Sequence, residues 1–183
     1  MTKNSCRNIE KQVLFYVNRA RKKRCLSGLK HDKGLTYLAK RHSAKMAKRR
    51  RIWHGGNVRI AEEYVKVKER DYSSLGERVI GWIFTVFGYL LQSSGLVEFG
   101  KDLRGAAIGV RAENVEMMSK GRVKIGRHVR DIRTDKDIAR ALHDNWMGSS
   151  GHRKNILTQE FKKIGIGIKR NGNGFYATEL FYG

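Results

Sequence analysis

Residues 164–181 constrain the fold more tightly than any other segment. Ile164, Ile166 and Ile168 alternate with glycine or lysine, and such alternation is typical of a β-strand. The turn sequence Asn171-Gly172-Asn173-Gly174 comes next, and the largely apolar run Phe175–Phe181 follows it. Asn-Gly pairs between two strand-like runs predict a β-hairpin at the C-terminus.

Three upstream segments have apolar residues at helical spacing, and they predict helices over about 8–24, 35–46 and 134–147. Thr134 or Asp135 can cap the third helix. Because His42 lies on the apolar stripe of the second helix, we expect a core or helix-contact histidine there. His143 lies off the stripe of its helix, so we expect it to be solvated. Helices around a largely antiparallel sheet make an α+β domain.

The segment Trp146–Leu157 combines a helix end, a Gly-Ser-Ser-Gly turn, a histidine and a new apolar run. A histidine after such a turn, here His152, is suited to bind a metal or move a proton. A capped surface turn is the plainer interpretation of the same residues.

The same segment resembles the C-terminal half of a prokaryotic CAP (SCP-like) domain, from the superfamily of cysteine-rich secretory proteins, antigen 5 and pathogenesis-related proteins. Other blocks are similar to the family in the same order. They are 17–21 (VNRAR), 38–47 (LAKRHSAKMA), 53–54 (WH), 112–115 (AENV), 164–167 (IGIG) and 176–181 (YATELF). The resemblance covers roughly residues 8–57 and 110–183, and it implies a three-layer α-β-α sandwich with a cleft on one side.

In that family the cleft holds two histidines and two acids. His54, Glu113 and His152 match three of these positions, and Ser149 occupies the position of the second acid. Two imidazoles and one carboxylate are a familiar ligand set for a divalent metal, so we expect weak binding of Zn²⁺ or a related ion by His54, Glu113 and His152. A pH-sensitive hydrogen-bond cluster is the alternative. Candidates for a missing ligand are Glu62, Glu63 and Glu179.

The resemblance favours a non-enzymatic binding or interaction module, because no enzymatic activity is common to the family and lipid or sterol binding recurs in it. The cleft would then hold a divalent metal or a lipid-like ligand. A hydrolase would use His54, Glu113 and His152, with Ser149 or Ser150 as a nucleophile. Neither serine lies in a Gly-x-Ser-x-Gly elbow, and serines in a Gly-rich turn are usually turn formers.

The chain carries 39 Lys and Arg against 17 Asp and Glu, a net charge of +22. Such a chain attracts anionic lipid or other polyanions without selecting among them. No RNA-binding or zinc-finger spacing supports base recognition. Because of the charge alone, a basic nucleic-acid-binding or anionic-membrane-surface protein is a further alternative. We interpret Arg19–Arg24 and Lys45–Arg51 as solvated helix faces or ends.

Cys6 and Cys25 are the only cysteines, and they flank the first predicted helix. A straight helix would hold their Cα atoms about 28 Å apart, whereas a disulfide permits ~7 Å. We therefore expect two free thiols, which suit a reducing compartment. Charged residues interrupt every apolar run before Val13, so no secretory signal is expected.

The sequence predicts a single domain, 1–183, with an unmatched insert at 58–109. Within the insert, Val79–Val97 runs nineteen residues without a charge. It would pack on the domain, lie in a membrane interface or span a bilayer. A single crossing would separate His54 from Glu113, which argues against the span. Location is therefore expected to be cytoplasmic, or membrane-associated through residues 79–97.

Overall fold

The computed structural model describes residues 3–55 and 110–183. Within them the helices are α1 (Lys3–Lys22), α2 (Lys33–Arg49), α6 (Asp135–Gly148) and α7 (Ser150–Leu157). The strands are β1 (Lys30–His31), β2 (Val110–Ser119), β3 (Gly121–Ile125), β4 (His128–Ile132), β5 (Lys163–Asn171) and β6 (Gly174–Tyr182).

The central sheet has the strand order β1-β5-β6-β2. Strands β5 and β6 form the predicted C-terminal hairpin, which is antiparallel from Lys163↔Tyr182 to Asn171↔Gly174. Gly172 in its turn has φ +58°, a left-handed conformation that glycine adopts without strain. Short β1 pairs in parallel with β5, and β3 and β4 form a separate antiparallel ribbon.

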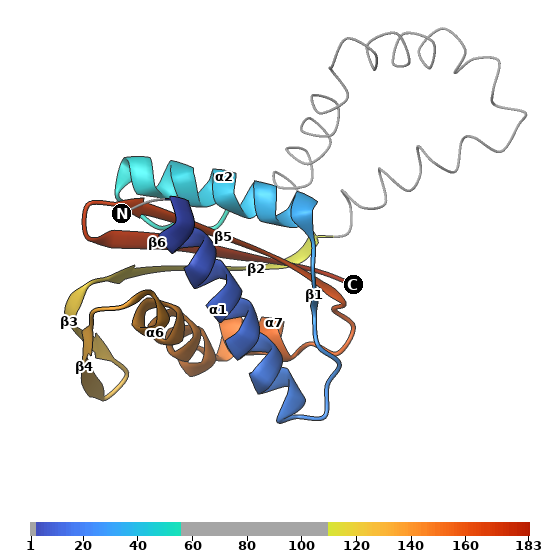
Figure 1. Ribbon diagram of the computed structural model, residues 1–183. Coiled ribbons are helices and arrows are strands. Elements are labelled where there is room, and N and C mark those ends of the chain that lie inside the picture. Colours follow the sequence, from blue (N-terminus) through green and yellow to red (C-terminus); the bar gives the residue numbers. More distant parts are fainter. Residues whose placement is uncertain (1–2, 56–109) are drawn as a thin grey trace, which may run out of the picture. The chain divides into compact units, whose positions relative to one another are not determined.

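Helix α2 covers one face of the central sheet, while α1, α6 and α7 cover the other (Figure 1). The expected α+β class and three-layer sandwich with a mainly antiparallel sheet are therefore confirmed. The larger apolar cluster joins α1, α6 and α7 to β5 and β6, and it includes Val13, Leu142, Ile166 and Phe181. On the α2 face, Met46 and Ala47 pack with Val115 and Tyr176.

Gly165 and Gly167 explain how α2 can lie so close to β5. A Cβ atom built on Gly165 would stand 2.2 Å from the carbonyl carbon of Leu35, and one on Gly167 would stand 2.2 Å from that of Ala39. No side chain fits in either place, because both obstacles are helix backbone. The alternation of isoleucine with glycine therefore gives β5 one apolar face and one bare face that receives the helix.

The outer edge of β5 is closed by side chains beyond the short β1 pairing. The backbone amide of Ile166 donates to Oγ1 of Thr36 at 3.3 Å, and that of Ile168 donates to Oε1 of Glu10 at 3.2 Å. Helices α1 and α2 thus supply acceptors that a neighbouring strand would otherwise provide.

The predicted helices are confirmed, with ends that differ by a few residues. Thr134 caps α6 in a reciprocal capping box with Asp137. His42 is buried, as expected. The prediction for His143 is wrong, because this residue is buried and stacks on Tyr16 with ring centroids 5.9 Å apart. Helix α6 is buried on two sides, so Ala139, His143 and Trp146 form a second inward stripe.

The interpretation of Arg19–Arg24 as a solvated stretch is wrong for Arg21, which is fully buried. Its guanidinium donates four hydrogen bonds to backbone carbonyls, at 2.8 Å to Ser27, Ile156 and Thr158 and at 3.2 Å to Phe161. The side chain therefore fastens the end of α1 to the segment that follows α7.

Cys6 and Cys25 are free, as predicted. In the part of the chain that the structure describes, none of the helices is both long and apolar enough to cross a bilayer. The predicted insert, 58–109, with its apolar stretch 79–97, lies outside the described residues.

Candidate functional site

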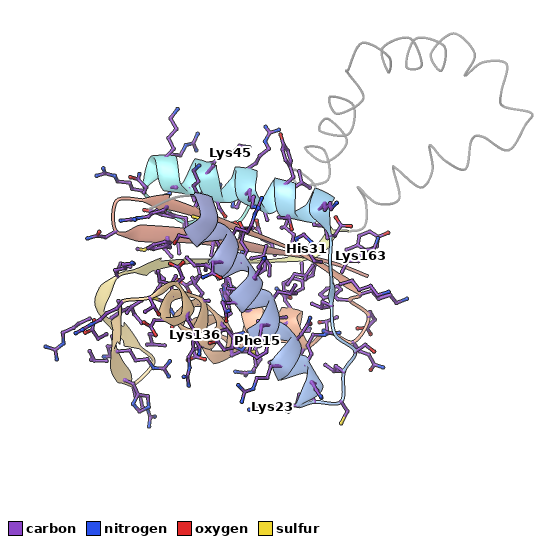
Figure 2. The ribbon with its side chains drawn as sticks, in the orientation of Figure 1. Phe15, Lys23, His31, Lys45, Lys136 and Lys163 are labelled. Carbon is purple, nitrogen blue, oxygen red and sulfur yellow. The ribbon has the colours of Figure 1, made fainter. Side chains whose placement is uncertain are left out.

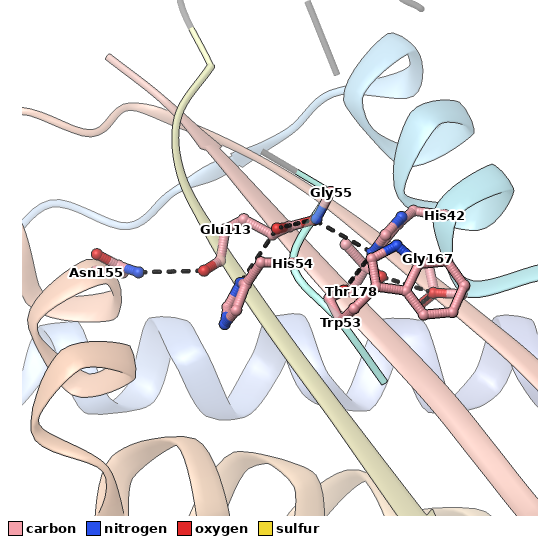
Figure 3. Close-up of polar contacts among 9 residues, drawn as sticks. His42, Trp53, His54, Gly55, Glu113, Asn155, Gly167 and Thr178 are labelled. Atoms are coloured by element: carbon pink, nitrogen blue, oxygen red, sulfur yellow. Dashed lines mark hydrogen bonds and ion pairs between the residues drawn. The ribbon is translucent and has the colours of Figure 1, made fainter. Parts of the chain in front are cut away.

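Glu113 is the centre of the candidate site, and it lies on β2 at one edge of the central sheet. Its side chain is 3% exposed. Oε2 accepts a hydrogen bond from the backbone amide of Gly55 at 2.9 Å and lies 3.2 Å from Nδ1 of His54 (Figure 3). A buried carboxylate with these partners fixes the segment Trp53–Gly55 against β2.

The contact with Glu113 orients the His54 imidazole. A carboxylate can only accept, so Nδ1 of His54 carries the proton that it donates to Glu113. In the neutral ring Nε2 then keeps a free lone pair, and the side chain is 59% exposed. Carboxylates hold metal-binding histidines in this manner in many proteins.

His42 approaches Glu113 from α2. Its Nε2 lies 3.6 Å from Oε1 of Glu113 and 2.8 Å from the carbonyl oxygen of Trp53, to which it donates. The imidazole also meets the Trp53 ring edge to face, with centroids 5.5 Å apart. The predicted core role of His42 holds, but its proximity to the carboxylate was not anticipated. The sequence signal for this proximity was that His42 and Ser43 form a pair that resembles the family.

Asn114 points to the opposite face of the sheet from Glu113, as neighbours in a strand must. Its Nδ2 donates to Oε2 of Glu179 at 2.9 Å and to the carbonyl oxygen of His152 at 3.3 Å. Its Oδ1 accepts from Asn155 at 2.9 Å. The pair Glu113-Asn114 therefore ties the sheet edge to both helical layers.

His152 lies in the first turn of α7 rather than in a loop. Its ring centroid is 6.1 Å from that of His54, with the two rings tilted by 46°. Burial, with a smaller contribution from nearby His54, lowers the pKa of His152 below its usual value. Its Nδ1 is buried and has no hydrogen-bond partner among the described residues. His152 is therefore a neutral imidazole near pH 7.

Ser149 links α6 to α7, and its backbone amide donates to the carbonyls of Asn145 and Trp146. Its side chain makes no capping hydrogen bond. Glu179 does not approach the two imidazoles by any described contact, since its partner is Asn114. Glu62 and Glu63 lie outside the described residues.

The structure brings together His54, Glu113 and His152, but not as a finished metal centre. Two imidazoles that share a tetrahedral Zn²⁺ at 2.0–2.1 Å would have ring centroids ~5 Å apart. The observed 6.1 Å is about one ångström wider. Among residues 3–55 and 110–183, no group of three His, Cys, Asp or Glu side chains is arranged to hold an ion.

Comparisons with known proteins bear on the family and the fold of the chain. A sequence model of the CAP family, described as the cysteine-rich secretory protein family, matches residues 104–182. The sequence has no significant match among curated proteins.

Several solved bacterial structures share the fold. An extracellular protein of Bacillus anthracis that contains an SCP domain has a TM-score of 0.53 at 18% identity, and the match covers 100% of this chain and 44% of that one. For an outer surface protein of Borrelia burgdorferi the TM-score is 0.55 at 14% identity, with coverages of 100% and 94%.

A cysteine-rich secretory protein of Staphylococcus aureus has a TM-score of 0.52 at 13% identity, with coverages of 100% and 40%. This chain thus spans less than half the length of the Bacillus and Staphylococcus proteins. The family match over residues 104–182, together with the shared fold, confirms the expected similarity of this chain to bacterial CAP-domain proteins.

Proposed function

We propose that this CAP domain is a non-enzymatic binding module that holds a divalent cation, such as Zn²⁺, between His54 and His152. The observation that carries the proposal is the contact of 3.2 Å between Nδ1 of His54 and Oε2 of Glu113. It directs the free Nε2 lone pair of His54 away from the carboxylate. Glu113 acts here as the group that orients a ligand, and bound water would complete the coordination.

Two further observations support a weak site. The low pKa of His152 keeps its imidazole unprotonated, which metal binding requires. The two rings must approach by about one ångström, and the free energy of that movement would be subtracted from the binding energy. Because an ion would be coordinated by only two protein side chains, exchange with solvent should be fast.

A hydrolase is supported less well. Within the described part of the chain, neither Ser149 nor Ser150 has a hydrogen bond from its hydroxyl to His152 or Glu113. Ser149 is instead the junction of two helices. A nucleophile needs a base within hydrogen-bond reach, and among the described residues neither Ser149 nor Ser150 has one in this cleft.

Calorimetric titration with Zn²⁺ tests the proposal. The wild type, His54→Ala and His152→Ala would be compared with His128→Ala, which removes an exposed histidine of the β4 strand. We expect binding to be lost in the first two variants and kept in the third. Glu113→Gln should weaken binding by about 10–100-fold. Equal affinity in all variants, or none in the wild type, would contradict the proposal.

The charge of +22 supports a second candidate function, attachment to an anionic membrane surface. In this proposal residues 79–97 supply the apolar contact and the basic surface supplies attraction. Flotation with anionic vesicles at low and high salt tests it. Binding that survives high salt supports the apolar contact, and loss of binding at high salt leaves only the charge.

A further inference from the structure

A basic groove lies at the edge of the sheet opposite Glu113. It has a volume of about 610 Å³ and is lined by residues of α1, β1, α2 and β5. Strand β1 forms this edge and β2, which carries Glu113, forms the other. His31 of β1 marks its position in Figure 2. The groove is therefore separate from the proposed cation site.

Three of the cations that line the groove have no ion pair within the described residues. Arg7 and Lys11 project from α1 and Lys33 begins α2, and all three are exposed. Lys40 is different, because its Nζ lies 2.8 Å from Oε2 of Glu10. Glu10 is the single acidic residue among the described lining residues, and its other oxygen accepts from the amide of Ile168.

The groove thus keeps a charge of about +3 that no carboxylate in the described region balances, with His31 counted as neutral. Like charges around one concave surface repel each other, and an anion placed between them relieves that repulsion. The positive charge of the groove is more than its share of the protein's overall positive charge. Lys23 after α1, Lys45 of α2, Lys136 of α6 and Lys163 of β5 lie apart from one another (Figure 2), whereas Arg7, Lys11 and Lys33 surround one hollow.

The floor and walls of the groove add other groups. Ile166 and Leu14 are apolar, and Tyr37 presents a ring with a phenol hydroxyl. His31 is held by a contact of 2.8 Å between its Nε2 and Oγ1 of Thr36. Oγ1 of Thr36 in turn accepts a hydrogen bond from the backbone amide of Ile166. The two side chains that close the edge of β5, Thr36 and Glu10, therefore also build the groove.

We propose that this groove binds a small, multiply charged anion of the phosphate type, such as a phosphate ester or a pyrophosphate. A guanidinium matches two phosphate oxygens with two parallel N–H groups, and ammonium groups add point charges around them. A single carboxylate would neutralise only a third of the groove's charge. A doubly or triply charged phosphate group fits it better.

Calorimetric titration with inorganic pyrophosphate tests the site at low and moderate salt. The test variant is Arg7→Ala/Lys33→Ala, and the matched control is Arg24→Ala/Lys48→Ala, which removes the same charges from exposed positions outside the groove. We expect the test variant to lose affinity by about tenfold or more and the control by less than about twofold. Equal losses would overturn the proposal, because they would show attraction by net charge alone. So would an absence of binding in the wild type.

A second experiment distinguishes a lipid headgroup from a soluble compound as the source of the phosphate group. Vesicles that contain phosphatidic acid present the same chemistry as a lipid headgroup, and vesicles of phosphatidylcholine alone are their control. Binding of both pyrophosphate and the acidic vesicles, each weakened in Arg7→Ala/Lys33→Ala, assigns the groove to headgroups. Binding of pyrophosphate alone assigns it to a soluble ligand. His152→Ala should bind pyrophosphate like the wild type, which separates this test from that of the cation site.

Discussion

Asn114 donates a hydrogen bond of 2.9 Å to Oε2 of Glu179, a carboxyl group that is completely buried. The other oxygen, Oε1, is also buried, and it has no hydrogen-bond partner in the described part of the chain. Burial raises the pKa of Glu179 to about 8, and the hydrogen bond from Asn114 only partly opposes this effect. At pH 7 the group is therefore mainly protonated and neutral.

The raised pKa of Glu179 predicts a protein that becomes less stable in mild alkali. Protonated Glu179 favours the fold most below its unfolded pKa of about 4.5, and that contribution is lost as the pH rises through about 8. The loss between pH 5 and pH 9 is at most on the order of 4 kcal/mol. Glu179→Gln should reduce this pH dependence, as measured by urea unfolding at several pH values. A slope as steep as that of the wild type would contradict the prediction.

His143 predicts a change of stability in the acid range. Burial lowers its pKa, although nearby Asp144 acts in the opposite direction. The unfolded chain therefore binds its proton more readily, and the stability that neutral His143 gives is complete above about pH 6.5 and declines as the pH falls. His143→Phe keeps the stacking on Tyr16 and removes the proton site. Its stability relative to the wild type should be greater at pH 5 than at pH 8, in thermal melts at both values.

Arg21→Met should strongly destabilise the fold. The change removes four hydrogen bonds and leaves buried carbonyls at the end of α7 without donors. We expect a loss of about 3 kcal/mol or more in the free energy of unfolding, measured with urea. Arg19→Met, at an exposed position on the same helix, is the control and should change it by less than about 0.5 kcal/mol. Similar effects for both variants would show that the buried contacts of Arg21 contribute little.

Gly167→Ala should separate α2 from the sheet. The added methyl group would stand 2.2 Å from backbone atoms of Ala39 and Lys40, so the helix itself must move. A loss of about 2 kcal/mol or more is expected in chemical denaturation. Gly151→Ala in α7 is the matched control, because its Cβ meets nothing within 4 Å. That variant should be neutral or more stable by up to about 1 kcal/mol.

Local patterns in the sequence predicted most of the elements but not how helices meet. The hairpin follows from alternation and its Asn-Gly turn, and the cap at Thr134 follows from the spacing to Asp137. His143 is buried because α1 packs across α6. The periodicity of α6 alone could not predict that a second helix covers this side of it. Arg21 was misjudged for the same reason, because its acceptors are far along the chain at Ile156, Thr158 and Phe161.

The candidate site depended on resemblance rather than on spacing. His54 and Glu113 are 59 positions apart, and no periodic pattern connects them. The family-like blocks named both residues and His152, and the structure brings these three near one another. The role of Asn114 was not predicted, because its partner Glu179 is 65 positions away on another strand. That tertiary hydrogen bond requires the folded sheet edge.

The closure of β5 by Thr36 and Glu10 also bears on how copies of this protein behave at high concentration. An edge strand with unsatisfied amides is a template on which another chain can extend the sheet, the first step toward fibrils. Here the amides of Ile166 and Ile168 are already bonded within the molecule. An incoming strand would have to displace two helical side chains before it gained its own hydrogen bonds. This edge should therefore resist self-association even though the strand is rich in isoleucine.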